Sequence, residues 1–288
     1  MVHSSLANST LKILFCAQMF LTPSTSLTWA YQLHYYLCFR TYRRRPSLAL
    51  RSVHLTDMFH EICTRSDFHL LELHPDAAQA LCLLSLRPTH TISKTIQILK
   101  SNSARHIGIP KPVWARGYFA RSVGRMRISA VRQYLDNQSE HHGYDVRMLP
   151  PVYRYRTRDP VRLSAAHCSF DLSHHLVFAT RYRKGVFNSH LGKCLSEYWL
   201  RVASARCFAI DQISVLPEHV HLIVRIVPSM SVEECALLLM NNGQYFVGKN
   251  YPEVFVEAGL DQLWESSAYA GTCGDFTTAF VKAWLGRK

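Results

Sequence analysis

Two stretches of 25 residues decide the fold of this chain: WARGYFARSVGRMRISAVRQYLDNQ, residues 114–138, and WESSAYAGTCGDFTTAFVKAWLGRK, residues 264–288. The two stretches align without a gap, and each begins with tryptophan. In each, a strand-like run is followed by a turn that contains glycine and then by apolar residues at helical spacing. The repeat predicts the same strand, turn and terminal helix at the ends of two similar units.

Further blocks recur in the same order in both halves of the chain. Two of these block pairs, which begin at residues 31 and 67 in the first half, read as strands. The third, which begins at residue 91, reads as a helix, and Ser93 and Ser231 are its candidate N-caps. Four blocks in one order make chance similarity improbable. The three additional pairs are residues 31–41 with 170–180, 67–76 with 209–218, and 91–103 with 231–243.

This organisation predicts an α+β protein of two tandem units. The polar, basic and proline-containing segment between the copies is typical of a linker. We therefore expect an N-terminal extension at 1–28, a first unit at 29–138, a linker at 139–165 and a second unit at 166–288.

The charge balance indicates a polyanionic partner. Lysine and arginine number 33 against 20 aspartates and glutamates, a formal net charge of +13. Basic side chains neutralise phosphates and release counterions, so nucleic acid is the leading partner class. On charge alone, a protein that is merely basic is the alternative.

Two further features exclude other classes. The nine cysteines are odd in number and form no CxxC pair, so we expect reduced, mostly buried thiols rather than a disulfide scaffold or zinc ribbon. The apolar run at 11–21 is too short to span a bilayer and is a poor signal peptide. We expect a cytoplasmic, nucleoid-associated protein with no membrane partner.

The sequence PEHVHLIV, residues 217–224, carries two histidines two positions apart on a strand-like run. Side chains at i and i+2 leave the same face of a strand, so His219 and His221 can converge on one cation. Among sixteen histidines, roughly one such pair is expected by chance. The preceding turn of proline and acid and the following aliphatic stretch strengthen the prediction.

In this context the chain resembles the HUH single-tyrosine transposases of small bacterial and archaeal insertion sequences. Their mark is a strand of the form Pro-(Asp/Glu)-His-hydrophobic-His, matched by residues 217–224. The resemblance covers residues 30–138 and 168–288. It implies two tandem HUH/ferredoxin-like units, each an antiparallel sheet with helices on one face. It also implies a nucleophilic tyrosine on the terminal helix, matched by Tyr134, and a metal-binding glutamine one turn later, matched by Gln138.

Each half lacks what the other half keeps. The second copy has Trp284 and Lys288 in place of the tyrosine and glutamine, and the segment from Pro75 to Pro88 has no histidine and reads as two residues longer than its counterpart. Decay of both copies is one explanation. Family members act as dimers in which the tyrosine helix of one subunit completes the histidine site of the other. The resemblance therefore implies a fused pseudo-dimer with one composite site.

The implied chemistry is metal-dependent cleavage and rejoining of single-stranded DNA. A divalent ion, Mg²⁺ or Mn²⁺, held by His219, His221 and Gln138 would polarise the phosphate that Tyr134 attacks. The product would be a 5′-phosphotyrosine and a free 3′-OH. The expected substrate is hairpin-bearing DNA at element ends, and the expected state is a monomeric pseudo-dimer or a homodimer.

Basic stretches with interspersed aromatic residues are the candidate DNA contacts, because they can pair with phosphates and stack unpaired bases. Two alternatives stay open: a catalytically degenerate hairpin-binding protein or transposition regulator, and a metal-dependent nuclease that does not rejoin DNA. The candidate DNA-binding residues are Arg43, Arg44, Arg45, Arg116, Arg121, Arg125, Arg181, Arg183 and Lys184.

Overall fold

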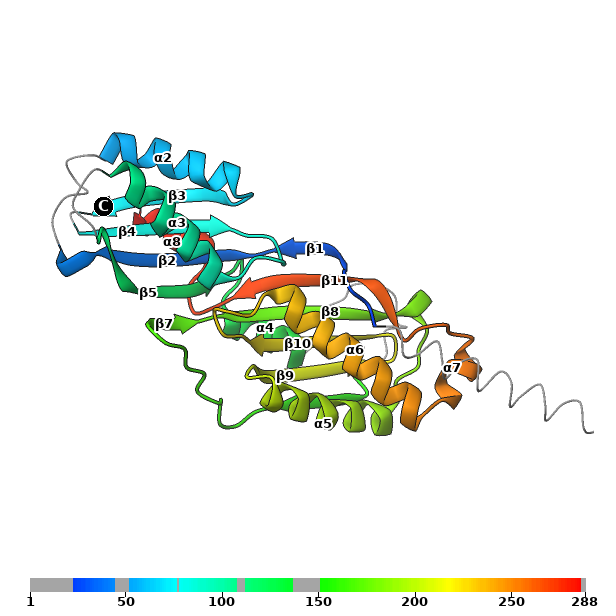
Figure 1. Ribbon diagram of the computed structural model, residues 1–288. Helices are drawn as coiled ribbons and strands as arrows, with labels where there is room; N and C mark the ends of the chain where they lie inside the picture. Colours follow the sequence, from blue (N-terminus) through cyan, green and yellow to red (C-terminus); the bar gives the residue numbers. More distant parts are fainter. Residues whose placement is uncertain (1–22, 45–51, 77, 108–111, 137–150, 286–288) are drawn as a thin grey trace, which may run out of the picture.

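The computed structural model describes residues 23–44, 52–76, 78–107, 112–136 and 151–285. Over these ranges the chain forms two α+β units that lie side by side (Figure 1). In each unit a mainly antiparallel sheet packs one face against two long helices. The predicted fold class, α+β with two tandem units, is confirmed.

The first unit runs from the N-terminal strand to the helix that carries Tyr134. Its elements are β1 (Thr28–Gln32), β2 (His34–Thr41), the 3₁₀ turn η1 (Tyr42–Arg44), α2 (Ser52–Arg65), β3 (His69–Asp76), β4 (Gln79–Ser85), α3 (Ile92–His106), β5 (Trp114–Val123) and α4 (Ile128–Asp136).

The second unit repeats this order with two additional elements. Its elements are β6 (Tyr153–Arg156), β7 (Cys168–Asp171), β8 (Ser173–Thr180), η3 (Arg181–Arg183), α5 (Ser189–Ala205), β9 (Ala209–Leu216), β10 (His219–Arg225), α6 (Val232–Asn250), α7 (Glu253–Ala258), β11 (Trp264–Cys273) and α8 (Thr278–Leu285). The additional elements are β6 and α7, and the helices that correspond to α2 and α3 are longer.

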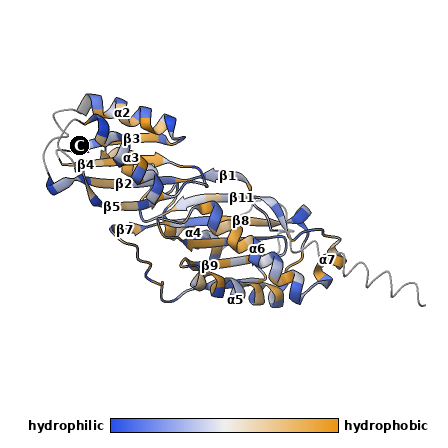
Figure 2. Ribbon diagram, viewed as in Figure 1, coloured by the Kyte–Doolittle hydropathy of each residue, from blue (hydrophilic) through white to orange (hydrophobic). Residues whose placement is uncertain are grey.

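The period of two along each strand places the core on one face of each sheet. On β2, Tyr35, Leu37 and Phe39 are buried beneath α2 and α3. In the second unit, the fully buried Trp199 of α5 donates from Nε1 to the carbonyl of Leu239 on α6, at 2.7 Å. The apolar residues accordingly concentrate along the strands and the inner faces of the helices (Figure 2).

The two units exchange edge strands. One sheet has the order β1-β11-β8-β10-β9-β6 and the other β3-β4-β2-β5-β7. Strand β1 of the first unit lies parallel to β11 of the second, and β7 of the second lies parallel to β5 of the first. These parallel pairings were not anticipated from the sequence, and they join the units through backbone hydrogen bonds.

The terminal helices are exchanged as well. Helix α4, drawn in green, packs against the sheet of the second unit, and α8, drawn in red, packs against that of the first (Figure 1). Val131 and Leu135 of α4 pack on Ile223 and Cys273. On the other side, Val281 and Leu285 of α8 pack on an apolar set consisting of Leu81, Leu83 and Val123.

The ends of β5 and β11, which lead into the two exchanged helices, meet where the chain crosses between the units. This crossing point is built from pseudo-symmetric contacts. The hydroxyl of Ser122 donates to the carbonyl of Cys273 at 2.6 Å, and the hydroxyl of Thr272 donates to the carbonyl of Val123 at 2.7 Å. Each hydroxyl also accepts a backbone N–H, Ser122 from Ser173 and Thr272 from His34, both at 2.9 Å. The two units therefore meet like the subunits of a symmetric dimer.

The hairpins β3–β4 and β9–β10 are equal in length, which corrects the two-residue insertion expected from the sequence. On β4, Gln79 pairs with Arg40 of β2. On β10, His219 pairs in the same way with Ala179 of β8. Gln79 and Leu81 therefore occupy the strand positions that correspond to His219 and His221.

The reason for that error is the role of one proline. Pro75 lies within β3, opposite Ala80, whereas Pro217 lies in the turn between β9 and β10. Matching these two prolines shifts the alignment by two residues. The strand pairing gives the correct register, because Gln79 lies opposite Arg40 as His219 lies opposite Ala179.

One predicted helix cap is confirmed and the other is wrong. Ser231 caps α6 and accepts from the N–H of Glu234 at 3.0 Å. Helix α3 is capped by Thr91, which accepts from the N–H of Lys94 at 3.3 Å. Ser93 lies in the first turn instead, where its hydroxyl bonds that of Tyr118 at 3.1 Å.

Two segments outside the repeated blocks also take part in the fold. Within the stretch assigned to a linker, residues Tyr153–Arg156 form β6 and pair antiparallel with β9. Ahead of β1, Ser24 exchanges two hydrogen bonds with the side chain of Asn241 on α6, at 2.8 and 2.9 Å. Both segments extend the second unit.

Candidate functional site

The two histidines of the His-x-His strand lie on the face of their sheet that α4 covers. His221 is almost fully buried and His219 is partly buried, and their ring centroids lie 4.8 Å apart. Nδ1 of His219 lies 2.9 Å from Oε1 of Glu218. Nδ1 of His221 lies 3.0 Å from Nε2 of His175 on β8. Glu218 therefore orients the imidazole of His219, and His175 orients that of His221.

Tyr134 reaches this site from the other half of the chain. Its ring lies 6.0 Å from that of His221, centroid to centroid, at an interplanar angle of 71°. Helix α4 places Val131 and Leu135 in the apolar contact beneath it, while Tyr134 is partly buried at its edge. The structure thus brings together the predicted tyrosine and the predicted histidine pair within one chain.

Ion pairs tie α4 to the sheet beside the site. Asp211 of β9 is 3% exposed and accepts from Nε of Arg225 at 2.9 and 3.0 Å. Nη2 of Arg132 on α4 approaches the same carboxylate at 3.3 Å. At the end of α4, Asp136 accepts from Nε2 of Gln212, at 3.0 Å. A buried carboxylate needs such partners, because desolvation penalises its charge.

Sequence reasoning missed His175 and Tyr269. His175 contacts His221 on one side, and its ring centroid lies 5.8 Å from that of Tyr269 on β11. Burial lowers the pKa of His175 to about 4 and raises the pKa of Tyr269. The available signal was the period of two on β8, which places residue 175 on the face opposite Leu176 and Phe178.

The third predicted metal ligand, Gln138, lies outside the described residues, two positions beyond the end of α4. Among the described residues, no group of three or more histidine, cysteine, aspartate or glutamate side chains is arranged to hold a metal ion. The described donors at the site are therefore the two imidazoles, whose close spacing and engaged Nδ1 atoms fit metal binding through Nε2.

The corresponding place in the first unit is apolar. Trp284 of α8 packs edge-on against Tyr36, with ring centroids 6.2 Å apart, and Leu81 is buried nearby. A cavity of about 300 Å³ beside Trp284 is lined mainly by aromatic and aliphatic side chains. Gln79, Leu81 and Trp284 occupy the positions that correspond to His219, His221 and Tyr134, so the two halves are chemically unequal.

The predicted DNA-contacting residues divide into two groups. Arg121 approaches Asp171 and Asp275 at 3.7 and 3.8 Å, and Arg181 pairs with Glu265 at 3.0 Å. Carboxylates of the protein thus partly neutralise both. Arg45 lies outside the described residues. The exposed members are Arg43, Arg44, Arg116, Arg125, Arg183 and Lys184.

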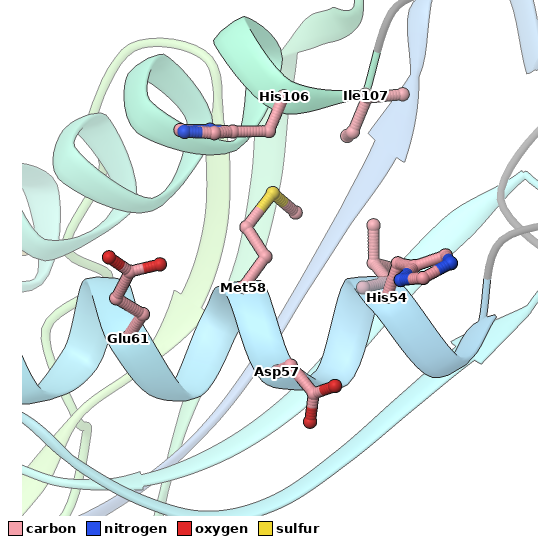
Figure 3. Close-up of a pocket in the computed structure, with 7 residues that line it drawn as sticks. His54, Asp57, Met58, Glu61, His106 and Ile107 are labelled. Carbon is pink, nitrogen blue, oxygen red and sulfur yellow. The ribbon is translucent and has the colours of Figure 1, made fainter.

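A cavity of about 440 Å³ opens away from this site, between α2 and α3 (Figure 3). Met58 of α2 and His106 of α3 face each other across it, while Asp57 points away. None of the residues predicted to act in the site lines this cavity.

The eight described cysteines are all free thiols, and four of them are buried: Cys63, Cys82, Cys235 and Cys273. No helix in the described ranges has the length and apolar character needed to cross a bilayer.

Two repeated α+β units, with a histidine-pair strand in one and a tyrosine helix from the other, define the class of HUH single-tyrosine transposases. The family model described as "Transposase IS200 like" matches residues 29–138 and 168–287. The chain belongs to this family of DNA transposases and contains its domain twice. The expected family and enzyme class are thereby confirmed.

Relatives include the ISDra2 transposase TnpA of Deinococcus radiodurans, 21% identical over 116 residues, which are 40% of this chain and 83% of that protein. A solved Deinococcus radiodurans structure assigned as a transposase is 25% identical and covers 40% of this chain and 97% of its own, with a TM-score of 0.32. A REP-associated tyrosine transposase bound to a REP hairpin is 12% identical, with coverages of 42% and 75% and a TM-score of 0.30.

Proposed function

We propose that this chain is a metal-dependent, single-stranded DNA transposase that cleaves and rejoins DNA through a 5′-phosphotyrosine at hairpin-bearing element ends. The observation that carries the proposal is the position of Tyr134 beside His221, contributed by opposite halves of one chain. One composite site would then use Tyr134 as nucleophile and His219, His221 and Gln138 as metal ligands.

The side chains that surround the histidine pair suit these roles. With Nδ1 of His219 and His221 engaged by Glu218 and His175, Nε2 is the nitrogen through which each ring would bind a metal. A bound Mg²⁺ or Mn²⁺ would supply Lewis-acid polarisation of the scissile phosphate.

Tyr134 would form the new bond to phosphorus and lose its phenolic proton, while the bond to the 3′ oxygen breaks and that oxygen leaves as a hydroxyl. Because the phosphotyrosine conserves the energy of the broken bond, a second 3′-OH can attack it and restore the DNA strand. The docked α4 would hold the tyrosine in place for both steps.

The substrate contacts would come from the exposed basic residues. Arg183 and Lys184 follow β8, and Arg125 lies close enough to Tyr269 to lower the pKa of that phenol against the larger opposing effect of burial. The ring of Tyr269 is partly exposed and could stack an unpaired base. We propose a cytoplasmic, nucleoid-associated location on the same grounds.

The test is incubation of the purified protein with labelled single-stranded hairpin DNA and Mg²⁺ or Mn²⁺, followed by a denaturing gel. We expect a covalent adduct with the wild type, none with Tyr134→Phe, and an adduct with the matched control Trp284→Phe. DNA binding without any adduct would favour the hairpin-binding regulator. Cleavage without adduct or rejoining would favour a simple nuclease.

A mixing experiment tests whether one chain carries the whole site. Tyr134→Phe chains are combined with chains carrying both His219→Ala and His221→Ala. A monomeric pseudo-dimer is expected to elute with the mass of one chain and to form no adduct after mixing. Recovery of the adduct would instead show that two chains exchange α4 in a homodimer.

A further inference from the structure

The two histidines of the proposed metal site have different partners at Nδ1. His219 meets the carboxylate of Glu218, its neighbour in sequence, at 2.9 Å. His221 meets Nε2 of His175, which belongs to β8, at 3.0 Å. The planes of the His175 and His221 rings are only 14° apart, which suits a hydrogen bond lying in the plane of both rings.

The chemistry of imidazole assigns a direction to the second hydrogen bond. A neutral histidine that binds a metal through Nε2 carries its proton on Nδ1, and that N–H needs an acceptor. At the position of His175 the acceptor is an imidazole nitrogen. Nε2 of His175 would accept this proton, and the proton of His175 would then lie on its own Nδ1.

We infer that His175 is a positioning residue, whose Nε2 accepts the Nδ1–H of His221 and holds that ring in the tautomer and orientation that bind the metal. This inference rests on the metal site of the proposed function. His175 acts only through His221. It also connects β8 to the site, whereas Glu218 acts on His219 from the adjacent turn.

The other half of the chain supplies an internal comparison. By strand register, Tyr36 of β2 corresponds to His175, and Leu81 of β4 corresponds to His221. Leucine has no ring proton to direct, and no histidine accompanies it. Tyr36 instead packs edge-on against Trp284. The half that keeps the histidine pair therefore also keeps an imidazole at the supporting position.

The experiment compares His175→Phe, which keeps a ring but removes the acceptor, with His175→Gln, which retains an amide oxygen. Tyr36→Phe is the matched control. Nitrogen-15 NMR of histidine-labelled protein reports the tautomer of His221, whose signals are assigned by their loss in His221→Gln. Mn²⁺ binding without DNA is measured by electron paramagnetic resonance, and thermal unfolding checks that each variant is folded.

We expect the wild type to hold His221 with its proton on Nδ1. His175→Phe should lose this single tautomer and bind Mn²⁺ about 10- to 100-fold more weakly, while His175→Gln and Tyr36→Phe stay close to wild type. A folded His175→Phe protein with wild-type tautomer and Mn²⁺ affinity would overturn the inference. If His219→Ala and His221→Ala leave Mn²⁺ binding unchanged, the proposed metal site fails. The tautomer of His221, compared between the wild type and His175→Phe, still decides the role of His175.

Discussion

The ring of Tyr134 lies 6.0 Å from the ring of His221, although the helix of one and the strand of the other belong to different repeats. The site is therefore only as well formed as the docking of α4 on the second sheet. That docking depends on the contact of Val131 and Leu135 with Ile223, and on the ion pair between Arg132 and Asp211.

Loss of the Arg132 guanidinium should reduce activity more than stability. In Arg132→Gln, Asp211 still pairs with Arg225, so the free energy of unfolding should fall by only about 1–2 kcal/mol. Looser docking of α4 should slow adduct formation by about 10-fold or more, because small displacements of a nucleophile are costly. Rates on hairpin DNA and urea unfolding measure the two effects.

The matched control is Lys282→Gln in α8. Lys282 corresponds to Arg132, and its 3.8 Å pair with Glu72 is solvent-exposed, so its loss should change stability by about 0–1 kcal/mol and leave the adduct unchanged. Equal effects of the two variants on adduct formation would contradict the role given to Arg132.

Alanine at Gly124 or Gly274 should destabilise the crossing of the two units. A Cβ at Gly124 would collide with the carbonyl oxygen of Thr272, and one at Gly274 with that of Ser122. We expect a loss of about 1–3 kcal/mol for each variant in chemical unfolding. Gly117→Ala is the control, because its Cβ would lie 3.5 Å from the nearest atom, an ordinary contact. A loss of the same size at Gly117 would refute the steric argument.

Acid should destabilise the protein through the buried interface between the units. Nε2 of His174 bonds the hydroxyl of Tyr35 at 2.8 Å, and burial lowers the pKa of His174 from 6.5 to about 3. Between these values the unfolded chain takes up a proton that the folded chain does not. The contribution of His174 to the free energy of unfolding is therefore fully present above about pH 6.5. It falls as the pH drops, by up to about 1.4 kcal/mol per pH unit.

Two neighbouring groups bear on this test. Burial raises the pKa of Tyr35, so Tyr35 stays protonated throughout the window, whereas His175, with a pKa lowered to about 4, adds a slope of the same sign. The measurement is urea unfolding between pH 7 and 4. In His174→Gln we expect the free energy of unfolding to depend less steeply on pH, by the uptake of about one proton on unfolding. An unchanged slope would exclude His174 as the source.

Restoring the second tyrosine should not create a second active site. In a Tyr134→Phe background, Trp284→Tyr places a phenol on α8, but Gln79 and Leu81 occupy the positions of the histidine pair. We expect no covalent DNA adduct on a denaturing gel, with the wild type run beside it. An adduct in this double variant would show that the apolar half needs no histidine pair.

The basic residues should differ in their contribution to DNA binding. Arg183 and Lys184 are exposed, so each alanine variant should weaken binding of single-stranded DNA and lower the salt slope by about 0.7. Arg181 is held by Glu265 and Asp261, so Arg181→Ala should change the slope much less. Affinities measured over a range of salt concentrations give the slopes, and equal slope changes at all three positions would contradict this division.

Much of the fold was predictable because the strands and helices follow from local patterns of apolar residues. The period of two on residues 173–180 and the helical period near residue 134 are visible in the sequence, and repetition makes each pattern more reliable. The two-residue misalignment at Pro75 arose because a proline in an edge strand looks like a turn proline. Strand β6 was missed because its four residues fall in a polar, basic segment.

The sequence by itself determined that the protein is a tandem repeat and which half keeps the tyrosine and which the histidine pair. Only the tertiary structure decided that Tyr134 lies beside His221, that Arg132 pairs with Asp211, and that His175 contacts His221. The physical reason is the different sequence separation of the residues involved. Periodicity reports which face of an element is apolar, whereas the partner that covers this face is chosen by packing between segments far apart in the chain.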